Sequence, residues 1–168
     1  NHNRTDGHRD TSEFKIYKKN LVKKLNYNCP ICEEEHEVEI YKEPSKVNIN
    51  RQLIDYLETY YYCPITSEEF YPSGVLNDNL LAARDNYRKK NNMLTSSEIK
   101  EIREYYGFSQ KEFSNLLGWG DINIHRYETK LIQKETYDEI IKRAKKDPLF
   151  LYNELKKHKD RFEKKHYD

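Results

Sequence analysis

The hydrophobic pattern of this chain changes its period near residue 79, and no other feature of the sequence constrains the fold as strongly. Before that point apolar and polar residues alternate around Val38 and again around Val47, with Pro44 between them, and Thr59–Tyr62 is a run of strand-forming residues. After it, apolar residues recur at the spacing of a helix. We therefore expect an α+β protein, in which a small N-terminal β domain that contains the cysteines precedes an all-α domain of five helices.

Charge divides the sequence at nearly the same place. Residues 1–28 carry a net charge of +4, residues 29–80 carry −8 and residues 81–168 carry +5, although the whole chain carries only +1. Such asymmetry indicates parts with different partners. We expect residues 1–26 to be a leader or basic arm, 27–78 a small β domain, 79–93 a linker helix, and 94–168 the helical domain with a C-terminal helix.

Composition limits the class of protein further. No apolar run approaches the roughly 18 residues of a membrane span, and no signal peptide is visible, so we expect a cytoplasmic protein. The three cysteines are an odd number, which argues against a disulfide-stapled secreted module. The 15 tyrosines must supply much of the core, and each buried ring then needs a partner for its hydroxyl.

Three helices open with a capping-box sequence, in which a hydroxyl residue precedes a glutamate by three positions. The pairs are Thr95 with Glu98, Ser109 with Glu112, and Thr136 with Glu139. Together with the apolar spacing, they predict helices over about 96–106 and 109–117, and a third that starts at 136 and stops at Pro148. Further helices are expected over 79–90, 121–128 and 149 to about 166.

The helices expected at 109–117 and 121–128 are short and are joined by a turn with two glycines, which is the pattern of a helix-turn-helix motif. In that motif the second helix lies in the major groove of DNA, and its first residues face the base edges. Helical spacing turns Ile124 and Tyr127 toward Phe113 and Ile102, with Asn123 either at the edge of the core or toward DNA. The candidate base contacts are Asp121, Ile122, Asn123, His125 and Arg126.

These candidates have different expected roles. Arg126 can donate two hydrogen bonds to one guanine, worth about 1–3 kcal/mol of discrimination, and Ile122 can contact a thymine methyl group. Asp121 is expected either to cap its own helix or to accept a hydrogen bond from a cytosine amino group. DNA phosphates are expected to bind backbone N–H groups and side chains at the start of the preceding helix, at Ser109, Gln110 and Lys111.

Three blocks of residues in this half resemble a known family. The blocks are Ser109-Gln110-Lys111-Glu112, Leu117-Gly118-Trp119-Gly120 and Arg126-Tyr127-Glu128. Over about residues 95–146 they resemble the Xre/Cro helix-turn-helix domain and, more closely, the C-terminal domain of MqsA-type antitoxins. The resemblance implies a homodimer that binds a palindromic operator and represses its own operon as the antitoxin of a type II toxin–antitoxin system. It also implies a recognition Asn and Arg at Ile122 and Arg126, so the Arg is kept and the Asn is not, although Asn123 is adjacent.

The cysteines form one complete and one incomplete metal-binding pair. Cys29-Pro-Ile-Cys32 is a knuckle in which two thiolates can hold one tetrahedral ion, and Cys63-Pro-Ile-Thr66 looks like a matching knuckle whose last ligand is replaced by a hydroxyl. The MqsA-type N-terminal domain has two C-x-x-C pairs and binds structural zinc, so the resemblance extends to about residues 27–146 and implies a degenerate, YgiT-like zinc finger here. Three possibilities stay open: the fourth ligand is His36, it is an acidic residue such as Glu68 or Glu69, or no metal binds and the thiols are buried.

Partners and activity follow from charge and motifs. The negative charge of residues 29–80 repels phosphates, so this part is expected to bind a small basic toxin, as the resemblance implies, or to present a solvated acidic face. No nucleophile elbow, phosphate loop or HExxH motif occurs, so we expect no enzymatic activity. Two other functions stay open: a protein–protein adaptor that uses the fold without binding DNA, and a phage or mobile-element regulator with no toxin partner.

Overall fold

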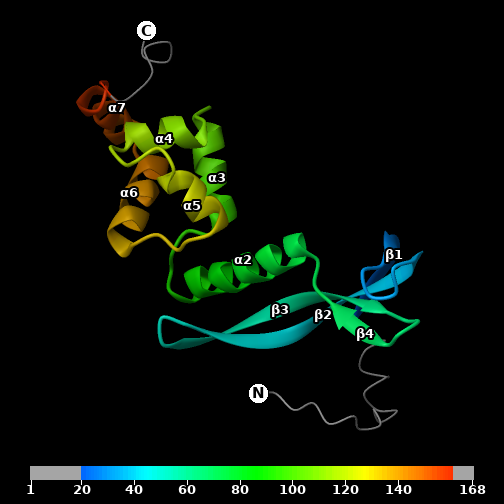
Figure 1. Cartoon of the computed structure of the whole chain (residues 1–168). Helices are drawn as coiled ribbons and strands as arrows, with labels where there is room; N and C mark the ends of the chain where they lie inside the picture. Colours follow the sequence, from blue (N-terminus) through cyan, green and yellow to red (C-terminus); the bar gives the residue numbers. More distant parts are fainter. Residues whose placement is uncertain (1–19, 161–168) are drawn as a thin grey trace. The chain divides into compact units, whose positions relative to one another are not determined.

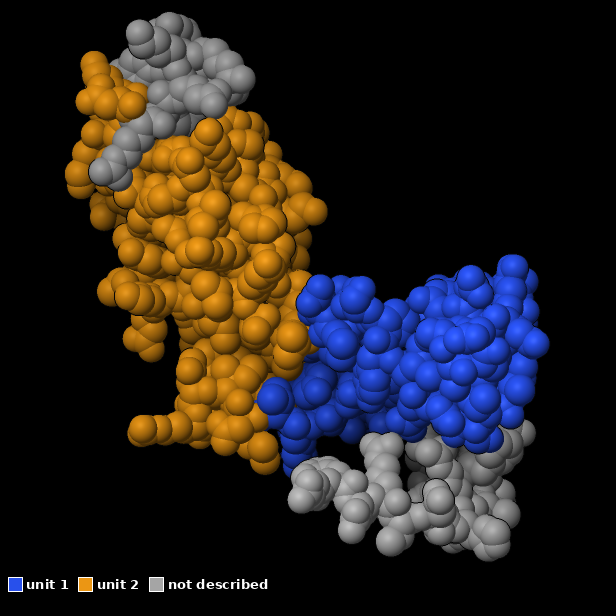
Figure 2. Space-filling model, in the orientation of Figure 1, with its two compact units in different colours: residues 1–47, 55–79 blue, residues 48–54, 80–168 orange. Residues whose placement is uncertain are grey.

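The computed structural model describes residues 20–160, and the chain divides into two compact units. Unit 1 comprises residues 1–47 and 55–79, and unit 2 comprises residues 48–54 and 80–168 (Figure 2). Unit 1 holds most of a β-sheet, and unit 2 holds most of the helices.

Four strands form one sheet in the order β1-β2-β3-β4 (Figure 1). They are β1 (Leu21–Asn28), β2 (Glu35–Ile49), β3 (Gln52–Cys63) and β4 (Glu68–Phe70). β1 pairs antiparallel with β2, and β4 pairs antiparallel with β3. The two residues between β2 and β3 both have positive φ, 48° at Asn50 and 64° at Arg51, as a type I′ hairpin turn requires.

The expected fold class is wrong, because the β part is not a small domain of short strands set before a separate all-α domain. β2 and β3 have 15 and 12 residues, and β1 already begins at Leu21, inside the expected arm. The end of the long hairpin, residues 48–54, belongs to unit 2, where the side-chain amides of Gln52 and Asn91 exchange two hydrogen bonds of 3.0 Å. A sizeable four-stranded sheet, with its hairpin end built into the helical unit, replaces that expectation.

Pro44 lies inside β2, although the sequence suggested that it separates two strands. The N–H of Lys42 donates to the carbonyl of Asn20 on the side of β1. Because N–H groups alternate between the two edges of a strand, the nitrogen of Pro44 faces the same edge as the N–H of Lys42. Proline has no N–H, so it donates no hydrogen bond from this position.

Tyrosines supply much of the sheet's core in unit 1, as expected. Tyr41 and Tyr60 are buried, and their rings stack with centroids 5.5 Å apart. The hydroxyl of Tyr60 donates to a Glu43 carboxylate oxygen at 3.3 Å, and that of Tyr41 donates to Glu39. Both of these buried hydroxyls thus have the expected partner.

Six helices follow the sheet. They are α2 (Ser73–Lys90), α3 (Ser96–Tyr105), α4 (Gln110–Leu116), α5 (Asn123–Thr129), α6 (Glu135–Lys146) and α7 (Pro148–Lys157). The capping boxes at Thr95 and Ser109 are confirmed. The third is wrong, because α6 begins at Glu135 after an N-cap at Lys134, which places Thr136 inside its first turn. The last five helices otherwise approximate the predicted series, whereas α2 begins at Ser73 rather than at residue 79.

The core of unit 2 lies among α3–α7. Its completely buried side chains are Ile99, Phe113, Leu116, Ile124, Ile141 and Ala144. The C-terminal part of α2 is fastened to the same unit by Arg88, which is fully buried and donates to Gln133, to Asp85 and to the carbonyls of Tyr127 and Leu131 at 2.6–3.0 Å. None of the described helices is long and apolar enough to cross a membrane.

Candidate metal centre and DNA-binding surface

Three cysteines and one histidine of unit 1 come together at the turns that connect β1 to β2 and β3 to β4. Cys29 follows β1, Cys32 lies in the first turn, His36 is in β2, and Cys63 ends β3. Their three sulfur atoms and one imidazole nitrogen all lie within 4.8 Å of one another. Cys29 and Cys63 are buried, and the other two are half-buried. These four residues could bind a metal ion such as zinc.

The two turns share a backbone hydrogen bond and a left-handed residue at matching positions, as expected of paired knuckles. In the first turn the N–H of Glu33 donates to the carbonyl of Cys29 at 2.9 Å, and in the second the N–H of Ser67 donates to the carbonyl of Cys63 at 2.8 Å. The donor residue has a left-handed φ in both, 60° at Glu33 and 58° at Ser67. Thr66 therefore occupies in the second turn the position that Cys32 occupies in the first.

His36 takes the place of the missing fourth cysteine. Its Nε2 lies 3.0 Å from the sulfur of Cys32 and 3.6 Å from that of Cys63, and its Nδ1 lies 2.9 Å from the backbone carbonyl oxygen of Glu37. That carbonyl can only accept, so Nδ1 carries the proton and Nε2 presents its lone pair to the sulfurs, the usual arrangement of a metal-binding histidine. Of the three possibilities, the geometry favours His36, and among the described residues neither Glu68 nor Glu69 joins the group.

The cysteine side chains differ in acidity. Burial raises the pKa of Cys63, but hydrogen bonds from the hydroxyl and N–H of Thr66 and from the N–H of Ile65 outweigh it and lower that pKa to about 6. Burial raises the pKa of Cys32. The hydrogen bond to the Glu37 carbonyl raises the pKa of His36, since it stabilises the protonated ring. Because a thiolate is the form that binds metal, the lowered pKa prepares Cys63 to act as a ligand.

A second candidate site lies on α4 and α5 in unit 2, which pack against each other and, through α5, against α3. Ile124 and Tyr127 are buried in the core together with Phe113, as predicted. Ile122, which is 50% exposed, and the exposed His125 and Arg126 lie at positions i, i+3 and i+4. These three side chains therefore share the solvent side of α5.

Most of the remaining residues predicted to contact DNA form hydrogen bonds within the protein or are partly buried. Gln110 is half-buried: its Nε2 donates to Glu128 at 3.3 Å, and its Oε1 lies 3.0 Å from Nδ1 of His125. The hydroxyl of Ser109 caps α4, whereas Lys111 is exposed. Asn123 is half-buried. Asp121 accepts a hydrogen bond from Asn115 at 2.9 Å, and the alternative that it caps α5 is wrong because Ile122 holds that position without a side-chain bond.

Sequence reasoning missed the ion pair that supports this surface. Glu128 is buried and accepts from Nε and Nη2 of Arg103 at 2.9 and 3.0 Å. The pair joins α3 to α5, and Gln110 of α4 binds the same carboxylate. An Arg and a Glu that are 25 residues apart give no periodic signal in the sequence. The one signal that could have pointed to this pair is the place of Glu128 in the Arg-Tyr-Glu block that carries the family resemblance.

Comparison of the chain with protein-family models, with curated proteins and with solved structures found no significant match. The resemblance to Xre/Cro domains and MqsA-type antitoxins therefore rests on the quoted residues and stays a prediction.

Proposed function

We propose that this protein binds double-stranded DNA with sequence preference, through the solvent side of α5 and the first turn of α4. The observation that carries the proposal is the row of Ile122, His125 and Arg126, left exposed on a short helix whose other side is held in the core. Major-groove base edges offer methyl groups, acceptors and donors, which an aliphatic chain, a guanidinium and an imidazole can contact. The ion pair of Arg103 with Glu128 fixes α5 against α3, so these side chains are presented on a rigid element.

Electrostatics support the same surface. Residues 81–168 carry a net charge of +5. Lys111 in α4 and Lys130 and Lys134 after α5 are exposed, so they are available to phosphates on either side of the bases. Repression of its own operon as an antitoxin, with a basic toxin as partner, stays a prediction of the resemblance.

The proposal is tested by selecting bound sequences from a randomised duplex library. We expect the intact protein to enrich one motif that contains a guanine. Arg126→Ala should lose the preference at that base and weaken binding of the best site by about 1–3 kcal/mol. Lys100→Ala, which removes an exposed charge from α3, is the matched control and should change neither. Enrichment of no duplex, or an unchanged motif for Arg126→Ala, would contradict the proposal, and the first result would favour the adaptor function.

We also infer that Cys29, Cys32, His36 and Cys63 hold a structural zinc ion. Three thiolates and one imidazole are a donor set typical of zinc, and four protein ligands leave no open position for catalysis. Among the residues that the structure describes, the apolar cluster around the site has four buried members, Cys29, Val38, Cys63 and Phe70. A cluster of that size needs a further staple, which the metal would supply.

Metal content tests this inference. The purified protein should contain one zinc ion per chain, and His36→Ala should weaken zinc binding by at least tenfold in competition with a chelator, since it removes one ligand. His125→Ala changes the same residue type on α5 and should bind zinc as the unaltered protein does. If the two variants bind zinc equally, His36 is not a ligand.

A further inference from the structure

A chain of hydrogen bonds connects a buried ion pair of unit 2 to an exposed histidine on α5. One oxygen of Glu128 accepts from Nη2 of Arg103 at 3.0 Å and from Nε2 of Gln110 at 3.3 Å. The other end of the Gln110 amide, Oε1, lies 3.0 Å from Nδ1 of His125. Arg103 and Glu128 are buried, Gln110 is half-buried and His125 is exposed, so the chain leads from the core to the surface.

The polarity of this chain determines which nitrogen of His125 carries the proton. Both oxygens of Glu128 accept from Arg103, so the group is a carboxylate that can only accept, and the Gln110 atom that faces it must be the amide nitrogen. The amide oxygen of Gln110 therefore faces His125. Because an amide oxygen can only accept, Nδ1 of His125 donates to it. In the neutral imidazole Nε2 is then the nitrogen without a proton, and it presents a lone pair.

The lone pair of Nε2 is available on the solvent side of α5. His125 is exposed next to Arg126, and among the described residues no donor forms a hydrogen bond to its Nε2. Arg126 can only donate, so it suits the acceptors of guanine, whereas the neutral ring of His125 offers an acceptor. The donors at the base edges of the major groove are the exocyclic amino groups of adenine and cytosine. The two neighbouring side chains thus match opposite kinds of group on the bases.

We propose that Gln110 positions His125 so that Nε2 of His125 accepts a hydrogen bond from the exocyclic amino group of an adenine or a cytosine in the major groove. This inference rests on the proposed DNA binding and assigns a direction to one of its contacts. His125 contacts the base, and Gln110 acts through His125 as a positioning residue. The first residue of α4 therefore determines what a residue of α5 recognises.

The position of the ring proton is tested first, without DNA, by NMR of the ring nitrogens in the intact, isotopically labelled protein at a mildly alkaline pH, where histidine is neutral. The resonances of His125 are those that His125→Ala removes. We expect Nδ1 to resonate as a protonated nitrogen and Nε2 as an unprotonated one. Gln110→Leu should mix the two forms, because no acceptor then holds Nδ1. An unaltered protein whose Nε2 carries the proton, or an unchanged spectrum for Gln110→Leu, would overturn the role of Gln110.

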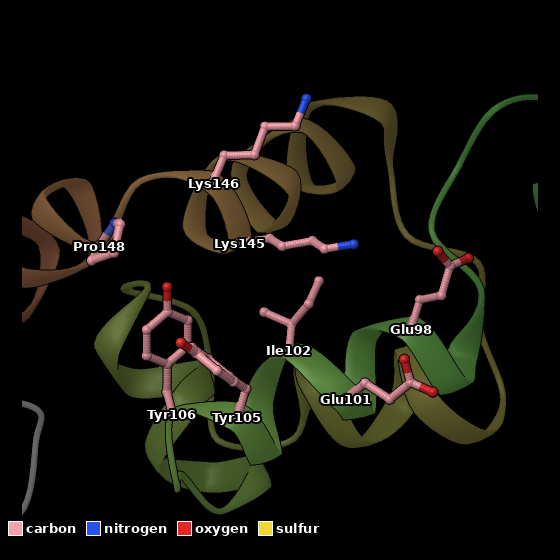
Figure 3. A pocket seen from close by; sticks show the side chains of 8 residues that line it. All are labelled: Glu98, Glu101, Ile102, Tyr105, Tyr106, Lys145, Lys146 and Pro148. Atoms are coloured by element: carbon pink, nitrogen blue, oxygen red, sulfur yellow. The ribbon is translucent and has the colours of Figure 1, made fainter.

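A matched control makes the same kind of change elsewhere on unit 2. Glu101 is exposed and lines a groove between α3 and α6 (Figure 3), and no described residue of α4 or α5 lines that groove. Glu101→Leu also replaces a polar side chain by leucine, and it should leave the His125 resonances unchanged. Circular dichroism checks that each variant is folded, and the spectrum of the unaltered protein tests the position of the proton even if a variant is not.

The amino group is tested on the selected duplex, at the base pair whose preference His125→Ala abolishes. An adenine there is replaced by purine, or a cytosine by 2-pyrimidinone, since each analogue lacks only the exocyclic amino group. Loss of one hydrogen bond should weaken binding of the unaltered protein about 2–10-fold. The same analogue should leave the affinity of His125→Ala unchanged, which separates the lost contact from any effect on the duplex itself.

The outcomes distinguish failure of this inference from failure of the DNA-binding proposal. If Arg126→Ala changes the preferred guanine of a selected duplex, but the analogue weakens both proteins equally or His125→Ala abolishes no preference, the amino contact is wrong and DNA binding stands. If no duplex is selected, both are wrong, and the ring nitrogens measured without DNA still decide the role of Gln110.

Discussion

Thr66 occupies the position at which the first turn of the metal centre has Cys32, yet it serves the neighbouring sulfur. Its hydroxyl and N–H both donate to Cys63, and with the N–H of Ile65 they lower the pKa of that thiol to about 6. Where the first turn has a thiol that can bind metal, the second turn therefore has a hydrogen-bond donor to Cys63. His36, held by the carbonyl of Glu37, supplies the fourth donor atom instead.

Thr66→Val should therefore weaken zinc binding although Thr66 is not a ligand. Loss of the hydroxyl raises the pKa of Cys63, so less thiolate is available, and loss of such a supporting hydrogen bond typically costs about 10–100-fold in metal affinity. The deficit should grow as the pH falls toward 6, where protons compete with the metal most strongly. Chelator competition across pH measures it. Ser67→Ala removes the adjacent exposed hydroxyl, and equal affinities of the two variants would contradict this role for Thr66.

The sequence could predict only part of each site. Cys29, Cys32 and Cys63 follow from their spacing, but His36 could be no more than one of three alternatives, because the choice depends on how two distant turns meet. The burial of Ile124 and Tyr127 follows from helical spacing and is confirmed. The engagement of Gln110 by buried Glu128 could not be foreseen, since its partner comes from another helix.

The turn between α4 and α5 depends on contact with α7. Gly118 in this turn has φ of 78°, and a Cβ there would lie 2.5 Å from Cε1 of His158, the residue that follows α7. The imidazole of His158 in turn lies 3.4 Å from the carboxylate of Glu154. The C-terminal end of α7 therefore helps to hold the turn that sets α5 relative to α4.

Gly118→Ala should destabilise unit 2. A left-handed φ costs an L-residue about 1–2 kcal/mol, and the clash with His158 adds to it. Gly74 is a matched control, because it lies in α2 with nothing within 4 Å of an added Cβ, so Gly74→Ala should be neutral or stabilising by up to about 1 kcal/mol. Urea unfolding measures both free energies. An unchanged free energy for Gly118→Ala would show that the turn tolerates another conformation.

Element boundaries could be predicted where the signal is local. Thr95 and Ser109 cap their helices as their spacing predicts. The start of α6 could not be predicted, because Asp138 is fixed by long-range bonds: its Oδ1 accepts from the N–H of Leu94 and from Gln133, and its Oδ2 pairs with Lys142. This buried network, and not capping by Thr136, therefore determines where α6 begins.

At the scale of the whole molecule, the division of the chain into two units differs from the one that charge and hydrophobic period predict. Charge and hydrophobic period both change near residue 79, yet the end of the β2–β3 hairpin belongs to unit 2. There Asn50 donates to the hydroxyl of Tyr87 at 3.3 Å, and Gln52 pairs with Asn91. These contacts join residues 37 and 39 positions apart, and no periodicity in a single sequence encodes them.

The affinity of the intact protein for its selected duplex, measured as a function of salt concentration, distinguishes DNA binding from an adaptor function. If α5 enters the major groove with lysines on the phosphates, log K should fall linearly with log salt, with a slope of about −0.9 for each phosphate contacted. Affinity should therefore fall steeply between low and physiological salt, and more steeply than for an apolar interface. Binding that is absent, or independent of salt, would contradict the DNA-binding account.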